Sequence, residues 1–216
     1  RSGSAGPTLR ELLTGIGVDP AAVSSGKHCV DFAKIAAFIE VHIEQSARLD
    51  NAVTDRVGVV TGIRGLIRHR TIQAIGETAH AGAVDFPYRK DAALACARFS
   101  SRLYDFWQHE LSLGRDLVAT TGVIRTSPSA SMNKIAGECI VSLDARSLSA
   151  AELNLFEKKV EAILQETAEE TGVIFKTDPL MRIAPVEADE GVMKKLETSA
   201  DILKIGTQRM PSGAGH

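Results

Sequence analysis

The sequence predicts a mixed α+β fold, and two observations carry that prediction. Between about residues 64 and 180 the expected elements follow the order strand, helix, strand, strand, helix, strand. That order is typical of the ferredoxin-like split βαβ arrangement, in which two helices cover one four-stranded antiparallel sheet. The segments on either side hold too few elements to close a core of their own. We therefore expect a self-contained domain inserted into a second domain that is only partly present.

The first 63 residues supply one helix and one strand. Thr8 to Glu11 has capping-box form and opens a helix that ends at Gly17. Farther along, the run from Phe38 to Ile43 alternates apolar and polar residues, which predicts a strand. The polar face of that strand would carry Glu40, His42 and Glu44.

The first half of the inserted domain follows. Residues 70–76 alternate as a strand, and residues 82–87 form a loop. Asp91 then opens an amphipathic helix. Two strands, at residues 117–124 and 138–143, are joined by the polar connector 127–131. The buried side of the helix carries Ala95, Phe99, Leu103, Phe106 and Trp107.

A second capping box, Ser149 to Glu152, opens the other long helix, and Gly172 is its expected C-terminal cap. Residues 173–176 give the last strand, and residues 187–203 form a further helix that ends at Gly206. These elements place the domain boundaries at 1–63, 64–180 and 181–216. The apolar stripe of the long helix consists of Leu153, Phe156, Val160, Ile163 and Leu164.

Composition excludes several classes of function. The formal net charge is -2 and no run of like charges occurs, so we expect no nucleic-acid partner. No apolar stretch reaches the roughly 18–20 residues that cross a bilayer, so we expect no membrane span. Residues 1–7 have no apolar core and do not form a secretory signal. The three cysteines, Cys29, Cys96 and Cys139, are far apart, which favours a reduced cytoplasmic protein.

Two histidines are candidates for chemistry. His42, between two glutamates, is either a metal ligand oriented by carboxylates or a histidine on a partly exposed strand. His80 lies between Gly76 and Gly82, in a loop where the backbone must turn or approach another group closely. It either stabilises a developing oxyanion or is a turn residue without a role.

Three further features could hold a substrate. Arg146 follows Asp144 on a strand, and a guanidinium is the natural partner of a substrate carboxylate, although Asp144 itself is its simplest partner. Asn133 lies in a polar loop, where turn formation is the ordinary role. The segment Ser212 to His216 could offer backbone N–H groups to an oxygen, or form a tight turn. The chain lacks GxGxxG, Walker A, GxSxG and HExxH motifs, which disfavours nucleotide, seryl and zinc-helix chemistries.

Taken in order, these motifs resemble the hydantoinase/carbamoylase family of metal-dependent amidohydrolases, within the aminoacylase/carboxypeptidase superfamily. The resemblance covers about residues 9–216. The motifs that carry it are His42-Ile43-Glu44-Gln45, Thr78-Ala79-His80-Ala81-Gly82, Asn133-Lys134-Ile135-Ala136-Gly137, Asp144-Ala145-Arg146 and Ser212-Gly213-Ala214-Gly215-His216.

The resemblance implies a role for each matching residue. His42 would be a metal ligand. His80 would be the catalytic histidine that stabilises the tetrahedral intermediate, often in the site of the partner subunit. Asn133, Arg146, Gly215 and Gln45 would bind the substrate. The residues 64–180 would be a lid and dimerisation domain inserted in an α/β metallohydrolase catalytic domain.

The resemblance also implies cofactors and partners. Two divalent ions (zinc, manganese, cobalt or nickel) would activate water in the whole enzyme, and the protein would form a homodimer through the lid domain. The substrate would be a small ureido acid with a carboxylate, and Leu66 favours an N-carbamoyl amino acid over allantoate.

Some parts of the family pattern are missing. The other metal ligands and the acidic general base have no counterpart here, so the chain is expected to be a fragment, inactive alone and without bound metal. An aminoacylase or peptidase of the same superfamily, or an inert dimerisation fragment, is the alternative.

Overall fold

The computed structural model describes residues 6–26 and 30–213. The chain divides into two compact units, residues 1–43 and residues 44–216. The first unit contains α1 (Leu9–Gly15), α2 (Pro20–Ser24) and the 3-10 turn η1 (Phe32–Lys34). The predicted capping box is confirmed, because the Thr8 hydroxyl accepts from the Glu11 N–H and the Glu11 carboxylate accepts from the Thr8 N–H.

The predicted strand at residues 38–43 is wrong. These residues belong to no strand, although the polar and apolar residues alternate as predicted. Val41 is 97% exposed and Phe38 is 83% exposed. A strand needs a neighbouring strand for its backbone hydrogen bonds, and no pairing forms here within the described residues.

The second unit is built on a large antiparallel sheet. Its central strands are β2 (Gly65–Ile75) and β7 (Glu138–Ser147), which pair from Gly65 with Ser147 to Ile75 with Glu138. The main order is β4-β7-β2-β8, with β4 at Val118–Thr120 and β8 at Ile174–Thr177. Two short strands extend the edges: β5 (Ile124–Thr126) pairs with β7, and β9 (Met181–Ile183) pairs with β2.

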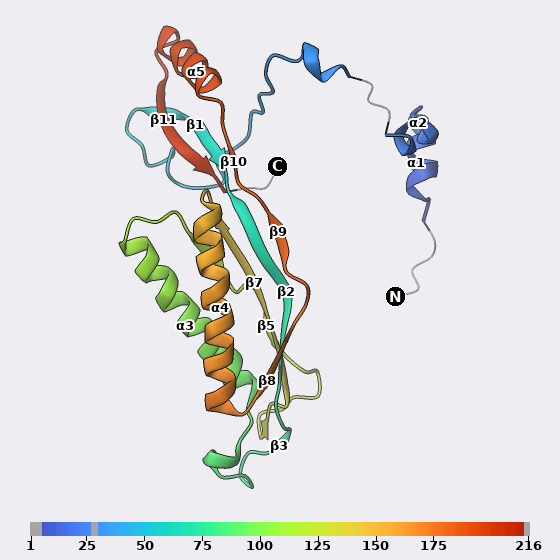
Figure 1. Ribbon diagram of the computed structural model, residues 1–216, viewed down its shortest axis with the longest axis vertical. Helices are drawn as coiled ribbons and strands as arrows, with labels where there is room; N and C mark the ends of the chain where they lie inside the picture. The colour runs from blue at the N-terminus through green and yellow to red at the C-terminus, as the bar shows by residue number, and fades with distance from the viewer. Residues whose placement is uncertain (1–5, 27–29, 214–216) are drawn as a thin grey trace. The chain divides into compact units, whose positions relative to one another are not determined.

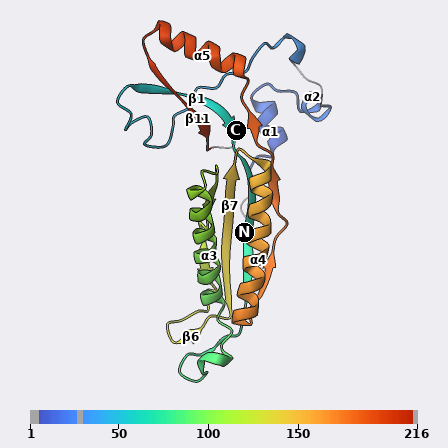
Figure 2. The ribbon, with the colours of Figure 1, turned by 60° about the vertical axis from the view of Figure 1, so that its left-hand side comes forward.

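Two long helices, α3 (Ala92–Ser112) and α4 (Ala150–Thr171), lie side by side along β7 (Figures 1 and 2). Both begin as predicted, since Asp91 and Ser149 accept hydrogen bonds from the first backbone N–H groups of α3 and α4. Strand β7 alternates strictly between buried and half-buried residues, so one face of the sheet packs on the helices and the other stays open.

The core lies between this sheet and these helices. The predicted buried residues of both helices belong to it, with Phe106, Trp107 and Leu164 only partly buried at its border. Gly172 ends α4 with a φ of 64°, as its predicted capping role requires. The largest fully buried side chains of the core include Phe99, Phe156, Ile67, Ile72, Leu143, Leu153 and Ile163.

The single strand predicted at residues 117–124 is in fact two. Strand β4 ends at Thr120, and β5 starts at Ile124. The Ser142 N–H donates to the Val123 carbonyl, while the Val123 N–H donates to the Ser142 hydroxyl instead of a backbone oxygen. This side-chain contact replaces one backbone bond, and the register shifts by one residue between the two strands.

A second, smaller sheet has the order β10-β1-β11. Its strands are β1 (Asp55–Ile63), β10 (Val186–Glu187) and β11 (Gly206–Ser212), and β1 runs parallel to β11. Helix α5 (Glu190–Ile202) packs on β1 and β11. Strand β1 is not among the predicted elements, the helix begins three residues later than predicted, and Gly206 opens a strand rather than only ending the helix.

The mixed α+β class is confirmed, while the narrower description as a ferredoxin-like lid stays a prediction. Strand β9 lies beyond residue 180 and still pairs with β2. None of the described helices is both long enough and apolar enough to span a bilayer.

Candidate functional site

Arg146 lies on the open face of the large sheet, near the end of β7. Its Nε donates to Asp144 Oδ1 over 2.7 Å, and its Nη1 donates to the carbonyl of Gly213. Strand alternation explains the arrangement, because residues two apart on a strand share a face. The structure therefore joins Arg146 to Gly213, the second residue of the predicted substrate segment, which directly follows β11. Gly215 lies outside the described residues.

A second arginine reaches the same carboxylate from the neighbouring strand. Arg68 is the register partner of Asp144 on β2, and its Nε donates to Asp144 Oδ2 over 2.7 Å. Burial raises the pKa of Asp144, but hydrogen bonds from Arg146 and Arg68 outweigh burial and bring the pKa below its ordinary value. Asp144 therefore stays ionised and holds both guanidinium groups.

A further ion pair supports this end of the sheet. Arg64 Nε lies 3.0 Å from both carboxylate oxygens of Asp116, which also accepts from the Leu148 N–H at 2.7 Å. The Arg64 N–H donates to the Ser212 carbonyl at 3.3 Å, so the end of β11 is tied to the start of β2. The large and small sheets meet at these bonds.

His80 and Asn133 lie at the opposite end of the large sheet. The predicted loop at His80 contains a short strand, β3 (Ala79–His80; Figure 1), which pairs with β6 (Lys134–Ile135; Figure 2). The Ala81 N–H donates to the Asn133 carbonyl at 2.9 Å. A local sequence pattern cannot show this pairing, because the two strands are more than fifty residues apart. The structure thus brings together two predicted site residues.

Both side chains have their acceptor groups satisfied locally. The Gly82 N–H donates to His80 Nδ1 at 3.1 Å, so the neutral ring carries its proton on Nε2. The Ser131 hydroxyl donates to Asn133 Oδ1 at 2.8 Å, which leaves the amide N–H groups of Asn133 as donors. Both residues are exposed. This end of the sheet therefore offers hydrogen-bond donors to the outside.

Close backbone contacts fix the segment that carries His80. A Cβ at Gly76 would lie 1.9 Å from the Lys90 carbonyl oxygen, and one at Gly137 would lie 2.3 Å from Thr78 Oγ1. Of the two alternatives expected for the loop between Gly76 and Gly82, a backbone turn or a close approach, the close approach is found at Gly76. Arg89 Nε donates to the Val84 carbonyl at 2.8 Å and closes the loop that follows His80.

His80 and Asn133 lie too far from Arg146 for these residues to act on one small molecule within one chain. Asn133 precedes β7, and Arg146 lies eight residues after Glu138, the first residue of β7. Eight strand residues span about 26 Å at a rise of about 3.3 Å per residue. The predicted substrate residues Asn133 and Arg146 therefore do not share a site in the isolated chain.

His42 belongs to the first compact unit and Gln45, three residues later in the sequence, to the second. His42 is exposed, and its Nδ1 lies 2.5 Å from the Ile43 carbonyl oxygen. The Glu44 carboxylate accepts from the N–H groups of Arg48 and Leu49 at 3.0 and 2.9 Å. Gln45 is exposed and has a φ of 56°.

The described residues do not by themselves complete a metal site. No group of three or more His, Cys, Asp or Glu residues among them is arranged to hold a metal ion. His42 is the single predicted ligand, and the neighbouring Glu44 carboxylate already caps the turn that follows it.

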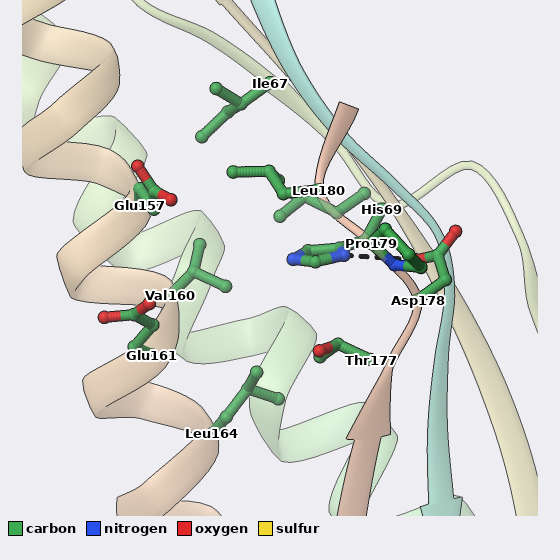
Figure 3. A pocket seen from close by; sticks show the side chains of 11 residues that line it. Ile67, His69, Glu157, Val160, Glu161, Leu164, Thr177, Asp178, Pro179 and Leu180 are labelled. Carbon is green, nitrogen blue, oxygen red and sulfur yellow. Dashed lines mark hydrogen bonds and ion pairs between the residues drawn. The ribbon is translucent and has the colours of Figure 1, made fainter. Parts of the chain in front are cut away.

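A cavity of about 450 Å³ lies between α4 and the segment that joins β8 to β9 (Figure 3). His69 projects into it from β2, and its Nδ1 lies 3.1 Å from Asp178 Oδ1. Leu164, Val160 and Leu180 line its apolar walls. His69 is not among the predicted site residues, because its partner is more than a hundred residues away and no local motif marks the pair.

The two buried cysteines are not reactive candidates. Cys96 and Cys139 are free and fully buried in the core. Burial and the neighbouring thiol of Cys139 raise the pKa of Cys96, which keeps it a neutral thiol. Cys29 lies outside the described residues.

No protein-family profile matches the chain, but similar proteins and structures are found. An N-carbamoyl-L-amino-acid amidohydrolase of Paenarthrobacter aurescens is 28% identical over 98% of this chain and 49% of its own length. An allantoate amidohydrolase of Escherichia coli is 30% identical over 84% of this chain and 43% of its own length. The chain spans about half the length of the curated relatives it matches.

The fold is also similar to that of a solved amidase structure. A hydantoinase/carbamoylase family amidase of Burkholderia ambifaria superimposes with a TM-score of 0.72 and 29% sequence identity, over 81% of this chain and 41% of the other.

Proposed function

Because this chain belongs to the hydantoinase/carbamoylase family of amidohydrolases, we propose that the whole enzyme hydrolyses a linear ureido C–N bond in an N-carbamoyl amino acid or a related ureido acid. The observation that carries the proposal is the contact between Arg146 and Gly213. It joins the predicted carboxylate-binding arginine to the predicted substrate loop.

Arg146 would bind the substrate carboxylate. Asp144 holds one edge of its guanidinium, and the carbonyl of Gly213 accepts from the other edge. A carboxylate is a stronger acceptor than a backbone carbonyl, so an entering substrate can replace Gly213 at Nη1. This exchange leaves the Asp144 contact in place and fixes the position of the ureido group relative to β7.

His80 and Asn133 would act on the ureido carbonyl of a substrate that is bound by Arg146 of a neighbouring subunit. Their free groups are the Nε2–H of His80 and the amide of Asn133, and such donors stabilise the oxyanion that develops in amide hydrolysis. Since about 26 Å of β7 separates them from Arg146, at about 3.3 Å per residue, a complete site needs a second copy of the chain. We therefore propose a homodimer assembled through the residues 64–180, the ferredoxin-like lid and dimerisation domain.

Divalent ions would complete the site in the whole enzyme. His42 would be one ligand, and the remaining ligands would come from outside the described residues. Bound zinc, manganese, cobalt or nickel would lower the pKa of a bound water and so supply the nucleophile. Substituting His42 by Ala is expected to lower the molar ratio of metal to protein, measured by elemental analysis. An unchanged ratio would remove His42 from the ligand set.

The substrate class can be tested by ammonia release from the metal-loaded whole enzyme. We expect turnover of N-carbamoyl amino acids, weaker turnover of allantoate, and little of N-acetyl amino acids or dipeptides. Arg146→Gln should raise KM for the ureido acid, whereas Arg125→Gln, an exposed arginine on β5, should not. Turnover of N-acetyl amino acids or dipeptides alone would favour an aminoacylase or peptidase. An absence of turnover on every substrate would favour a dimerisation role for this segment.

The cytoplasmic location stays a prediction.

A further inference from the structure

The open face of the large sheet holds a three-residue ionic cluster, formed by Arg68, Asp144 and Arg146. Asp144 Oδ1 accepts from Arg146 Nε, and Asp144 Oδ2 accepts from both Nε and Nη2 of Arg68. Each carboxylate oxygen therefore has its own arginine at short range, and Arg146 Nη2 reaches Oδ2 only at 3.5 Å. The three side chains are between 24% and 33% exposed.

The charges of this cluster do not cancel. Two guanidinium groups surround one carboxylate, so the cluster keeps one positive charge, while the nearby Arg64 is balanced by Asp116. Without Arg68, the single charge of Asp144 would neutralise Arg146. An anionic substrate would then meet a neutral pair rather than a cationic cluster, and partial burial makes this difference stronger than in water.

The hydrogen bonds of the cluster also fix the orientation of Arg146. Arg68 uses two donors on one carboxylate oxygen, an arrangement that fixes the orientation of Asp144. Asp144 in turn fixes the Nε edge of Arg146 and leaves the Nη1 edge directed to Gly213. The low pKa of Asp144 agrees with this double contact.

We propose that Arg68 is a positioning and specificity residue that acts through Asp144, keeping Arg146 oriented and cationic for the carboxylate of the substrate. The proposal rests on the proposed carboxylate-binding role of Arg146. It predicts that Arg68 favours substrates with a free carboxylate over the same molecules in which that group is an uncharged carboxamide.

The first experiment compares an N-carbamoyl amino acid with its carboxamide in the whole enzyme. Arg68→Gln should raise KM for the acid about tenfold, while kcat for the acid and both constants for the carboxamide stay within about twofold. Arg68→Lys restores the charge and should recover part of the loss. Arg70→Gln, at an exposed arginine on the same strand, is the control and should change neither substrate. Equal losses on acid and carboxamide, or no loss on the acid, would overturn the proposal.

A second readout does not depend on turnover. The Nε–H resonance of Arg146 in ¹⁵N NMR, assigned with Arg146→Lys, should be protected from solvent exchange in the natural sequence and in Arg70→Gln. It should exchange faster in Arg68→Gln, whose circular dichroism and melting temperature serve as the folding control. An unchanged Arg146 resonance would refute the positioning role even if no ureido substrate were turned over. A changed resonance together with inactivity on all ureido acids would instead refute the proposed function alone.

Discussion

At the scale of single residues, the site depends on which hydrogen-bonding edge of each polar group is already occupied. Local N–H and O–H donors occupy the acceptor atoms of His80 and Asn133, so their donors remain for a ligand. Arg146 has one edge held by Asp144 and the other by a backbone carbonyl that a carboxylate can replace. These arrangements determine what each residue can bind.

His80→Ala should reduce kcat of the whole enzyme by about 10²–10³-fold with a small change in KM, because an oxyanion donor acts mainly in the transition state. Steady-state kinetics on an N-carbamoyl amino acid would test this. His109→Ala, at an exposed histidine near the end of α3, is the matched control. A loss confined to KM would show that His80 binds the substrate without stabilising the transition state.

Asp144→Asn should destabilise the protein by about 1–3 kcal/mol at pH 7, since it leaves two arginines without their carboxylate. Because the folded-state pKa of Asp144 is lowered, its contribution to stability is present above about pH 4 and is lost as the pH falls through the folded-state pKa. The difference in urea midpoint between the two proteins should therefore shrink on acidification. Asp105→Asn, at an exposed position on α3, should show no such trend, and a difference that persists at low pH would contradict this explanation.

At the scale of elements, two glycines decide where α4 ends and how tightly the segment around His80 packs. Gly172 has a φ of 64°, and Gly76 lies against the Lys90 carbonyl. Both positions need a residue without a Cβ, the first for its backbone angle and the second for space.

Gly172→Ala is expected to lower the free energy of unfolding by about 1–2 kcal/mol, because alanine is strained in the left-handed region. A Cβ at Gly172 would lie 3.4 Å from Lys90 Cγ, so the backbone angle rather than a severe clash sets the cost. Chemical denaturation of the variant measures it. Gly122→Ala is the control, because its Cβ would meet only Thr120 Cγ2 at 3.7 Å and its φ is not positive. Equal effects at both positions would refute this reason.

At the scale of the whole molecule, the two groups of proposed site residues lie at opposite ends of one sheet. Arg68, Asp144 and Arg146 lie where the large sheet meets the small one, while His80 and Asn133 lie at the far end (Figure 1). Under the proposed function, one chain would therefore carry two halves of different sites.

Mixing the inactive variants His80→Ala and Arg146→Ala of the whole enzyme should restore activity. If each site combines His80 of one subunit with Arg146 of the other, mixed dimers contain one intact site, and random mixing gives up to about a quarter of the natural activity. Activity after subunit exchange, against each variant alone, tests this. A mixture no more active than its components would place the whole site within one chain.

Elements whose signals are local can be predicted from the sequence. Capping residues at Thr8, Asp91 and Ser149, the left-handed cap at Gly172 and the apolar stripes of both long helices predicted where helices begin, end and face. These features depend on neighbours within one or two turns, which a single sequence displays. The motif series also indicated the family, because each motif is a short contiguous stretch of the chain.

Which segments pair with one another is visible in the folded chain alone. Residues 38–43 alternate like a strand yet have no partner among the described residues, while β3 and β6 are too short to be recognised and form because they meet. The same holds for Arg68, whose role depends on its register opposite Asp144 across two strands. Strand pairing and ionic contacts join residues far apart in the chain, so no local pattern reveals them.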